Sequence, residues 1–426
     1  MKGKPYSIEK GDSSFSICVG PVHPALKEPV KLNLQISGEK VTGVDFELSQ
    51  VHRGIEWAGT RRNPIQIMFL AERICGICNM CHILAFSKAV ESIGKIEVPT
   101  RAEYIRTIAA ELERIHSHIL WAGVAAHELG FDSVMHYTWK LRENVMDTIE
   151  YLTGNRVTKA IITIGGVRRD IKESQIPRVR QTIDYYRNSF DKLAKVFLND
   201  PVMKSRTRDT GVLSYGDAMK TCAVGPTARA SGVRKDVRKD EAYGAYQDFG
   251  FEPILPDALT GEIRGDVYDR VICRLLEVKQ SADIIDFCIK NMPSGPIAYE
   301  EKIPKLLAEM KGYHGEALGR HEAPRGEVIH YVKMVGESAP YSWKVRAPTY
   351  NNLLGWIPML MGEQIADIPI IAASIDPCMS CTNRVVKAPS GKPAFAKTSS
   401  MARAQPNCSF LLRLPTPLRS WPNPRP

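Results

Sequence analysis

Residues 14–50 alternate between apolar and polar side chains. The segment Lys31–Ile36 has the sequence KLNLQI, and a second alternating run extends from Val41 to Leu48, with glycines at positions 38 and 43. An alternation of period two places one face of a strand on the core and the other face in solvent. We therefore expect a small antiparallel sheet over residues 14–50.

Residues 101–129 carry apolar side chains that are three and four positions apart. The members of this stripe are Ile105, Ile108, Leu112, Ile115, Ile119 and Ala122. This spacing places them on one face of an α-helix. Similar periodicity predicts further helices near residues 136–153, 173–197, 266–292 and 300–311. Short segments rich in glycine and proline separate the predicted helices, at residues 165–166, 225–226 and 293–296.

These patterns predict an α+β fold that is mainly α, with a helical-bundle core and small peripheral antiparallel sheets. We expect one domain over residues 1–384, with the sheet at about 14–50 and the helical core at about 66–380. The last 42 residues, 385–426, contain eight prolines, no acidic residue and no apolar periodicity. That composition is typical of an extended or disordered segment.

The net charge of +10 would suggest a nucleic-acid-binding protein if it were spread over the whole chain. Seven Lys or Arg residues lie in 385–426, and the rest of the chain is close to neutral, so we expect no nucleic-acid partner. Hydrophobic residues make up 44% and charged residues 24%, an ordinary soluble composition. No apolar run reaches the roughly 18 residues that cross a bilayer, and the N-terminus lacks the apolar core of a signal peptide. We expect a cytoplasmic protein that reaches a membrane only through partners.

Ten cysteines are present, and four of them form two Cys-x-x-Cys pairs. The pairs are Cys75–Cys78 and Cys378–Cys381, which begin 303 residues apart. Disulfides are not expected in a cytoplasmic chain of this size. Each pair presents two sulfurs to one soft metal ion, so spacing alone leaves open a structural zinc site, a redox-active metal and unrelated thiols. Zinc ribbons usually keep their halves about 15–20 residues apart, which favours a buried centre that joins the two ends of the domain.

The residues around the two pairs narrow these interpretations. The first pair lies in ERICGICNMCH (72–82), and the second lies in DPCMSCTNR (376–384). The combined pattern, RxCGxCxxxH near the start and DPCxxCxxR near the end, resembles the large subunit of nickel–iron hydrogenases. More closely, the chain resembles the membrane-bound, energy-converting branch, whose large subunits are related to the quinone-site subunit of respiratory complex I. The resemblance covers most of residues 15–384, and its supporting segments are 20–29, 52–57, 111–120, 153–157, 165–170, 224–232, 264–270 and 322–331.

The resemblance implies a nickel–iron centre that is held by four thiolates. Cys75 and Cys378 would be terminal ligands of nickel, while Cys78 and Cys381 would bridge nickel to an iron that carries CO and cyanide. Thiolates are soft donors that suit nickel. A terminal thiolate also keeps enough basicity to accept a proton when hydrogen is cleaved, which makes Cys378 a catalytic candidate. A magnesium ion is a further cofactor candidate from the same resemblance.

Five further residues match positions with roles in that family. Glu28 would relay protons, against the alternative of a surface carboxylate. Arg325 would place its own positive charge over the open metal position, with Asp376 beside it. The alternatives are an ordinary arginine–carboxylate pair and, for Asp376, a helix N-cap. Pro324 would wall the diatomic ligands of the iron. His82 would hydrogen-bond a bridging sulfur, or else be a histidine at a helix start with no special partner.

Other residues in the matching segments have open roles. Cys81 departs from the family pattern, and we expect a buried, inert thiol rather than a ligand. His23 matches a position associated with the quinone cavity of the complex I relatives, and it belongs either to a proton path or to the structure. Candidates for a relay or a subunit contact, against the alternative of ordinary structural residues, are Arg53, Glu56, His116 and His118.

The resemblance also bears on the proline-rich C-terminal segment. Many such subunits are made as precursors, and a maturation protease removes the extension after the second motif once nickel is inserted. Arg384 stands at that boundary, where other branches have histidine, so we expect residues 385–426 to be removable. The unusual composition leaves two alternatives, an altered reading frame and an unprocessed precursor.

The function implied by the resemblance is that of the catalytic subunit of an energy-converting hydrogenase, which interconverts protons and H2. Because the chain has no further cysteine set for a cluster, electrons would come from ferredoxin through an iron–sulfur small subunit. Membrane ion-translocating subunits would couple the reaction to ion movement and hold the chain on the cytoplasmic side of the cell membrane. The alternatives are a sulfur- or quinone-reducing complex I-like subunit and a structural zinc scaffold of a membrane complex. Complex I relatives lack the four-cysteine set, and zinc needs none of Glu28, Arg325 and Asp376.

Overall fold

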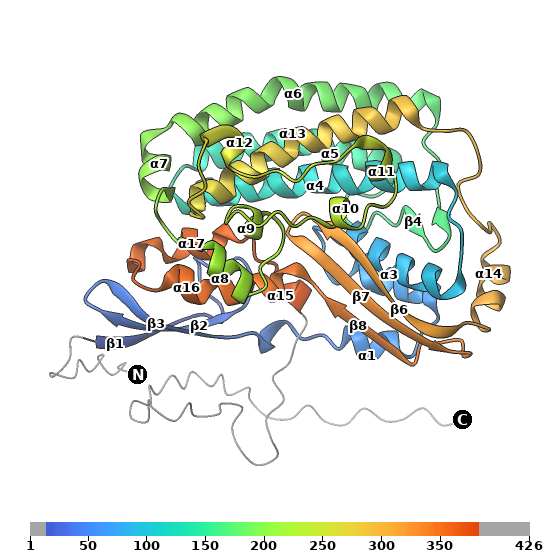
Figure 1. The fold of residues 1–426 in the computed structure, drawn as a ribbon, viewed down its shortest axis with the longest axis horizontal. Helices are drawn as coiled ribbons and strands as arrows, with labels where there is room; N and C mark the ends of the chain where they lie inside the picture. Colours follow the sequence, from blue (N-terminus) through green and yellow to red (C-terminus); the bar gives the residue numbers. More distant parts are fainter. Residues whose placement is uncertain (1–13, 383–426) are drawn as a thin grey trace, which may run out of the picture. The chain divides into compact units, whose positions relative to one another are not determined.

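The computed structural model describes residues 14–382. Its N-terminal part is a three-stranded antiparallel sheet in which β2 (Lys31–Ser37) pairs with both β1 (Ser14–Val19) and β3 (Lys40–Glu47) (Figure 1). The apolar positions of β2 are buried: Leu32, Leu34 and Ile36. The sheet that the alternation predicted over residues 14–50 is therefore confirmed.

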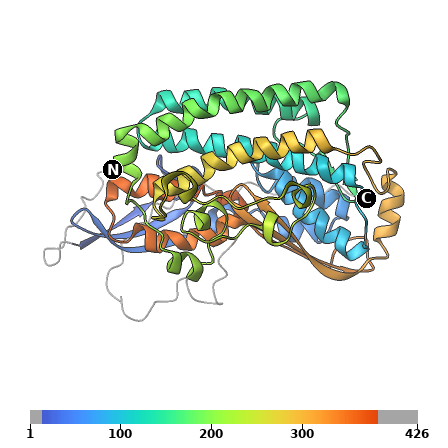
Figure 2. The ribbon, with the colours of Figure 1, turned by 45° about the horizontal axis from the view of Figure 1, so that its top comes forward.

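Four long helices form a bundle beside this sheet (Figures 1 and 2). They are α4 (Thr100–Glu128), α5 (Asp132–Thr153), α6 (Ile176–Asn199) and α13 (Val267–Asn291). Helices α4 and α6 each contact both α5 and α13, which closes the bundle. All four predicted helices are confirmed, with ends that differ by at most four residues, and so is α14 (Ile303–Met310).

A second antiparallel sheet follows α14 in the sequence. It consists of β6 (His314–Ala323), β7 (Gly326–Val335) and β8 (Ser342–Arg346), in the order β6-β7-β8. Helix α3 (Asn79–Gly94) packs against β6 and β7. The fold class is confirmed as α+β and mainly α, but the segment expected to be helical at about 66–380 contains this sheet. Helix α3 covers part of the sheet, and the first residues of β6 stay exposed, as expected of a small peripheral sheet.

The approach of α3 to β6 is closest at Gly319. A Cβ atom at this position would lie 1.8 Å from the carbonyl oxygen of Ala85 and 2.7 Å from the backbone nitrogen of Ala89. We expect Gly319→Ala to lower the free energy of unfolding of the full chain by about 3 kcal/mol or more, because neither backbone atom moves easily. Denaturant unfolding measures this loss. The matched control is Gly216→Ala on the exposed face of α8 (Tyr215–Lys220), where little surrounds the added methyl group, and an equal loss in both variants would contradict the close packing.

Shorter elements connect these layers. The remaining α-helices are α1 (Ile55–Gly59), α2 (Pro64–Glu72), α7 (Pro201–Thr207), α9 (Gly225–Arg229), α10 (Val237–Asp240), α11 (Tyr246–Phe249), α12 (Asp257–Thr260), α15 (Pro348–Asn352), α16 (Trp356–Leu360), α17 (Ile368–Ser374) and α18 (Met379–Thr382). The 3-10 turns are Ser49–Val51, Glu173–Gln175, Leu353–Gly355 and Ile365–Asp367, and the hairpin is β4 (Ile162–Thr163) with β5 (Gly166–Val167). Among residues 14–382, no helix combines the length and the apolar character that a bilayer crossing requires. The C-terminal segment 385–426 and its boundary residue Arg384 lie outside the described residues.

Candidate metal centre

The two Cys-x-x-Cys pairs meet in the interior of the protein. The Sγ atom of Cys378 lies 3.3 Å from that of Cys75 and 3.1 Å from that of Cys381, and the Sγ atoms of Cys78 and Cys381 are 3.7 Å apart. All four side chains are buried. Four sulfurs that share one metal ion at about 2.3 Å lie roughly 3.3–3.8 Å from one another, so this cluster has the dimensions of a metal site. The prediction that both ends of the domain meet at a buried centre is confirmed.

Two tight turns present these sulfurs. Cys78 directly precedes α3, and Cys378 directly precedes α18. The backbone N–H groups of Ile77 and Cys78 point at the Cys75 sulfur, at 3.3 and 3.5 Å. Hydrogen bonds from the other three thiols, and beyond them the charge of Arg325, hold the pKa of Cys75 well below its ordinary value. Hydrogen bonds within the cluster and burial raise the pKa values of Cys78, Cys378 and Cys381 well above the ordinary value, so the cluster favours negative charge on one sulfur, that of Cys75.

Arg53 fastens the two turns to each other. Its guanidinium donates to the carbonyl oxygens of Arg73 at 2.8 Å and Ile74 at 2.6 Å, just before the first pair. It also donates to the carbonyl oxygen of Ser380 at 2.9 Å, inside the second pair. Of the two roles left open for Arg53, these bonds support the structural one.

Arg325 is buried beside the cluster and held by three hydrogen bonds. Its Nε donates to the carbonyl oxygen of Asp376 at 2.7 Å, one Nη donates to Oδ1 of the same residue at 2.8 Å, and the other donates to Oγ of Ser117 at 3.3 Å. Although burial disfavours the charged form, Asp376 and the cysteine sulfurs raise the pKa of Arg325 well above its ordinary value. The structure thus fixes a permanent cation next to the thiol cluster. Pro324 precedes it in the buried turn between β6 and β7.

Glu28 connects to the cluster through a residue that the sequence analysis did not select. The Oγ atom of Ser380 donates to Glu28 Oε1 at 2.9 Å and lies 3.1 Å from the Cys378 sulfur. The backbone N–H of Ser380 donates to the other carboxylate oxygen at 3.2 Å. Glu28 is thus half-buried and hydrogen-bonded rather than a free surface carboxylate. The sequence feature that could have identified Ser380 is its position between the two cysteines of the second Cys-x-x-Cys pair.

His82 faces the cluster from the first turn of α3. Its Nε2 lies 3.6 Å from the Cys381 sulfur, and its Nδ1 lies 3.1 Å from Nε2 of His330. The indole N–H of Trp343 donates to Nδ1 of His330 at 3.2 Å. His82 thus has specific partners, which excludes the alternative of a helix-start histidine without any. His330 lies in a segment that matched the family, whereas Trp343 carried no sequence signal.

Cys81 belongs to the start of α3 and not to the cluster. Its thiol donates to Oε2 of Glu113 at 2.8 Å, and the backbone N–H groups of Met80 and Cys81 donate to the same carboxylate at 2.9 Å. Burial raises the pKa of the Cys81 thiol well above its ordinary value. Lys159 balances the buried carboxylate at 2.9 Å. These contacts agree with the expectation of a buried, inert thiol.

A fully buried ionic network lies behind the Arg325 turn. Its charged members are Glu111, Arg114, Arg229, Asp236, Arg238, Glu277 and Glu322. Arg114 donates to the carbonyl oxygens of Glu322 at 2.5 Å and Ala323 at 3.3 Å. Because these carbonyl groups lie two and three residues before Arg325, the network holds the turn that carries the guanidinium.

The histidines of α4 are buried beside the same network and the first cysteine turn. His118 Nε2 lies 2.9 Å from Glu277, and His116 Nε2 lies 3.0 Å from the carbonyl oxygen of Ile77. Burial lowers the pKa of His118 to about 4 and that of His116 well below its ordinary value. Because both side chains are buried within this chain, the prediction that they contact another subunit is wrong.

Two other candidates lie farther out. Glu56 accepts from the backbone N–H of Val345 at 2.9 Å and pairs with Lys344 at 3.1 Å, so it ties α1 to β8. His23 is exposed, and its Nδ1 accepts from the backbone N–H of Ala25 at 3.2 Å. These contacts give Glu56 a structural role and leave the role of His23 as a prediction.

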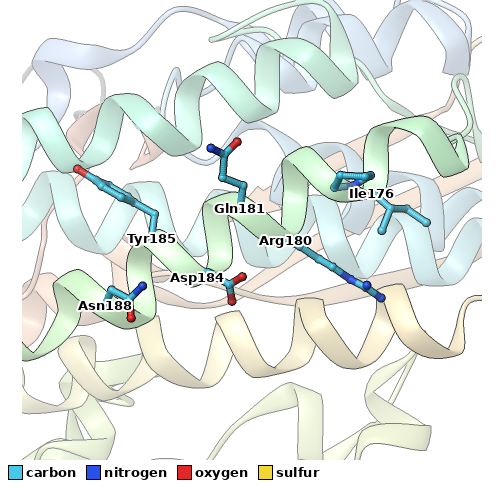
Figure 3. A pocket seen from close by; sticks show the side chains of 7 residues that line it. Ile176, Arg180, Gln181, Asp184, Tyr185 and Asn188 are labelled. Atoms are coloured by element: carbon cyan, nitrogen blue, oxygen red, sulfur yellow. The ribbon is translucent and has the colours of Figure 1, made fainter.

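A surface hollow lies apart from the cysteine cluster. It has a volume of about 590 Å³, and α6 supplies every side chain that lines it, including Arg180, Asp184 and Tyr185 (Figure 3). Its lining contains no cysteine or histidine. The chemistry-bearing side chains are gathered instead at the two cysteine turns.

Two family models match the chain. Residues 53–125 match the nickel-dependent hydrogenases, and residues 128–384 match the 49 kDa subunit of respiratory-chain NADH dehydrogenase. The chain is 47% identical to the membrane-bound hydrogenase subunit alpha of Pyrococcus furiosus, over 90% of this chain and 91% of that protein. It is 40% identical to the carbon monoxide-induced hydrogenase of Rhodospirillum rubrum, over 87% of this chain and 100% of that protein.

A solved structure shares the same fold. It is a chain of the membrane-bound sulfane sulfur reductase, an archaeal respiratory membrane complex, with a TM-score of 0.81 and 30% identity. The alignment covers 89% of this chain and 100% of that chain. With the buried cysteine cluster and these similarities in place, the chain belongs to the family that unites the large subunits of membrane-bound nickel–iron hydrogenases with the 49 kDa, quinone-site subunit of respiratory complex I.

Proposed function

We propose that this chain is the catalytic subunit of a membrane-associated hydrogenase that interconverts H2 with protons and electrons. The observation that carries the proposal is the meeting of four buried cysteine sulfurs beside a fixed guanidinium and a hydroxyl–carboxylate pair. A nickel–iron centre bound there would supply the cleavage and formation of H2. Cys75, Cys78, Cys378 and Cys381 would hold this centre, whose iron would carry CO and cyanide.

The surroundings of the cluster favour catalysis over a structural zinc site. Structural zinc needs four ligands in a closed shell and no further charged group. Here Arg325 lies within electrostatic reach of three of the sulfurs and is itself oriented by Asp376. A preorganised cation stabilises charge that develops during a reaction, because it needs no rearrangement at that moment. We assign this role to Arg325, with Asp376 as its positioning residue and Pro324 as part of the wall around the iron.

A proton route leads outward from the second cysteine turn. The Cys378 sulfur, the Ser380 hydroxyl and the Glu28 carboxylate are linked by contacts of 3.1 and 2.9 Å. A hydroxyl accepts and donates at once, so it passes a proton between its two neighbours without becoming charged. Glu28 is half-buried and therefore stands between the enclosed cluster and solvent. We assign Cys378 as the first proton acceptor and Glu28 as the exit group.

Ser380 provides a test of this route. We expect Ser380→Ala to lower turnover by roughly 10²-fold, in the range of a lost proton-transfer group, while nickel content stays unchanged. The matched control is Ser380→Thr, which keeps the hydroxyl and should retain most of the activity. Adding Glu28→Gln to Ser380→Ala should cost little more, because both residues serve one path. Hydrogen production and proton–deuterium exchange are the measurements, and full activity of Ser380→Ala would contradict the route.

The electron path requires partner subunits. Within residues 14–382, one group of three or more close metal-ligating side chains is present, and its members Cys75, Cys78 and Cys381 belong to the cysteine cluster. We infer that electrons enter from ferredoxin through an iron–sulfur small subunit and that membrane subunits couple the reaction to ion translocation. The chain would then lie on the cytoplasmic side of the cell membrane through these partners. A maturation protease would remove residues 385–426, and a magnesium ion is a further cofactor to assay.

The second candidate function is the reduction of sulfane sulfur. The observation that favours it is the close structural match to a chain of a sulfane sulfur reductase complex. The two activities differ in what consumes the electrons. A purified complex that reduces a sulfane-sulfur donor and neither makes nor consumes H2 would support this candidate over the hydrogenase.

Metal analysis of the native complex tests the proposal directly. We expect close to one nickel per chain, little zinc, and infrared bands of metal-bound CO and cyanide. Zinc without such bands, in chains shown by mass spectrometry to lack residues 385–426, would support the zinc scaffold and overturn the proposal. Mass spectrometry is essential here, because a retained C-terminal segment would mark a precursor that awaits nickel.

A further inference from the structure

We propose that Trp343 and His330 are positioning residues that fix the direction of a hydrogen-bond chain into the metal centre. The chain runs from Trp343 through His330 and His82 to Cys381, and it presents the Nε2–H of His82 to the Cys381 sulfur. The direction of this hydrogen-bond chain is argued from the geometry alone. Its effect on the metal rests on the proposed function.

The direction follows from the chemistry of the indole ring. The Nε1–H of tryptophan is a donor and never an acceptor. Because it lies 3.2 Å from Nδ1 of His330, that nitrogen is the acceptor, and the proton of the neutral ring is on Nε2. His330 Nε2 lies 3.1 Å from Nδ1 of His82, which must accept in turn. The proton of His82 is then on Nε2, 3.6 Å from the Cys381 sulfur.

Both imidazole rings are enclosed by the protein: His82 is 1% exposed and His330 is fully buried. A doubly protonated His82 would bring its Nδ1–H against the Nε2–H of His330, so two donors would face each other. The neutral tautomers are therefore the ones that satisfy every contact.

The backbone and its neighbours hold Trp343 in place. In the β7–β8 register, Trp343 lies opposite Val332 and His330 lies opposite Val345, so the two rings are diagonal neighbours on one face of the sheet. A Cβ atom at Gly59 would lie 2.1 Å from Trp343 Cε3, which shows how closely α1 packs on the indole ring. The ring of Phe86 packs on it edge to face, with centroids 5.7 Å apart. The indole N–H therefore has little freedom to turn away from His330.

The consequence is an asymmetry among the four sulfurs. Cys381 receives an imidazole N–H, whereas Cys378 contacts the Ser380 hydroxyl. A hydrogen bond to a thiolate withdraws electron density from the sulfur and from any metal bound to it. Fixing the tautomer of His82 thus sets the donor strength of one particular ligand, from a tryptophan three side chains away.

Nitrogen NMR of histidine tests the tautomers without any metal. The full chain is labelled with ¹⁵N-histidine and studied in the solid state, and the signals are assigned by difference with His82→Gln and His330→Gln. We expect protonated Nε2 and unprotonated Nδ1 in both rings. Trp343→Phe should transfer part of the proton population to Nδ1 of His330 and His82. If that variant does not fold, benzothienylalanine at position 343 removes the N–H and keeps the ring shape.

The matched control is Trp356→Phe, which removes a buried indole N–H that donates to the carbonyl oxygen of Ala372 at 3.2 Å. It should leave both tautomers unchanged. A protonated Nδ1 in either ring of the wild type, or tautomers unmoved by loss of the Trp343 N–H, would overturn the inference.

The same substitutions in the native complex show the effect on the metal. We expect unchanged nickel content and shifted CO and cyanide bands in the benzothienylalanine variant at position 343, and unshifted bands in Trp356→Phe. A complex that lacks nickel but shows the expected tautomers would overturn the proposed function and leave this inference standing. A nickel-containing complex with Nδ1-protonated His82 would overturn this inference alone.

Discussion

Replacing Cys378 by serine is expected to remove bound nickel and to lower hydrogen turnover by more than about 10³-fold. A serine hydroxyl is a harder and less acidic donor than a thiol, so it binds a soft metal weakly. The substitution also removes the sulfur that lies within 3.3 Å of Cys75, Cys381 and Ser380. Nickel per chain by elemental mass spectrometry and hydrogen production from an artificial electron donor are the two measurements.

Cys81→Ser is the matched control for this experiment. Cys81 is as buried as the cluster cysteines and lies in the same segment, but its thiol donates to Glu113 and a serine hydroxyl would do the same. We expect this variant to keep its nickel and most of its activity. Loss of nickel in both variants would contradict the assignment of ligands, because a general sensitivity of the fold would then explain the effect.

Arg325→Lys is expected to lower turnover by about 10²–10³-fold while nickel content stays unchanged. The guanidinium makes three hydrogen bonds in fixed directions, to two atoms of Asp376 and to Ser117. A lysine ammonium keeps the charge but has no planar fork, so it does not reproduce this position. Steady-state kinetics with H2 as substrate, together with metal analysis, separate the loss of catalysis from the loss of the centre.

The control for the arginine is Arg264→Lys. Arg264 forms exposed ion pairs with Asp209 and Glu262, and pairs of this kind contribute little to stability. We expect its activity to stay within about twofold of the wild type. If Arg325→Lys lost nickel in proportion to activity, the side chain would be a structural support of the cluster rather than a catalytic group.

Much of the fold was predictable because its helices carry local patterns. The apolar stripe of α4 predicted a helix over 101–129 and the structure has Thr100–Glu128, since side chains three and four apart share a helix face whatever surrounds them. The alternation of β2 predicted a strand for the same reason. The second sheet was missed although β7 alternates, with His330, Val332 and Met334 buried. Its partner β6 begins with exposed residues, and the cover by α3 comes from a segment more than 200 residues away.

The candidate site was likewise predictable in part. Two short motifs predicted which four cysteines meet, because the paired spacing and the flanking residues are properties of the chain itself. The contacts of His82, Glu28 and Cys81 depended on partners that no spacing indicates. Ser380 lies 352 residues from Glu28, and His330 lies 248 residues from His82.

Local patterns in the sequence were sufficient to predict the mainly helical fold, the N-terminal sheet and the four cysteines of the candidate metal centre. Periodicity and motif spacing act over a few residues, and they survive in any tertiary context. The folded structure was needed to show that Cys81 pairs with Glu113, that Ser380 lies between Cys378 and Glu28, and that Trp343 donates to His330. These arrangements depend on where distant backbones cross, because a hydrogen bond requires two atoms within about 3 Å, and packing of α3, β7 and β8 sets that distance here.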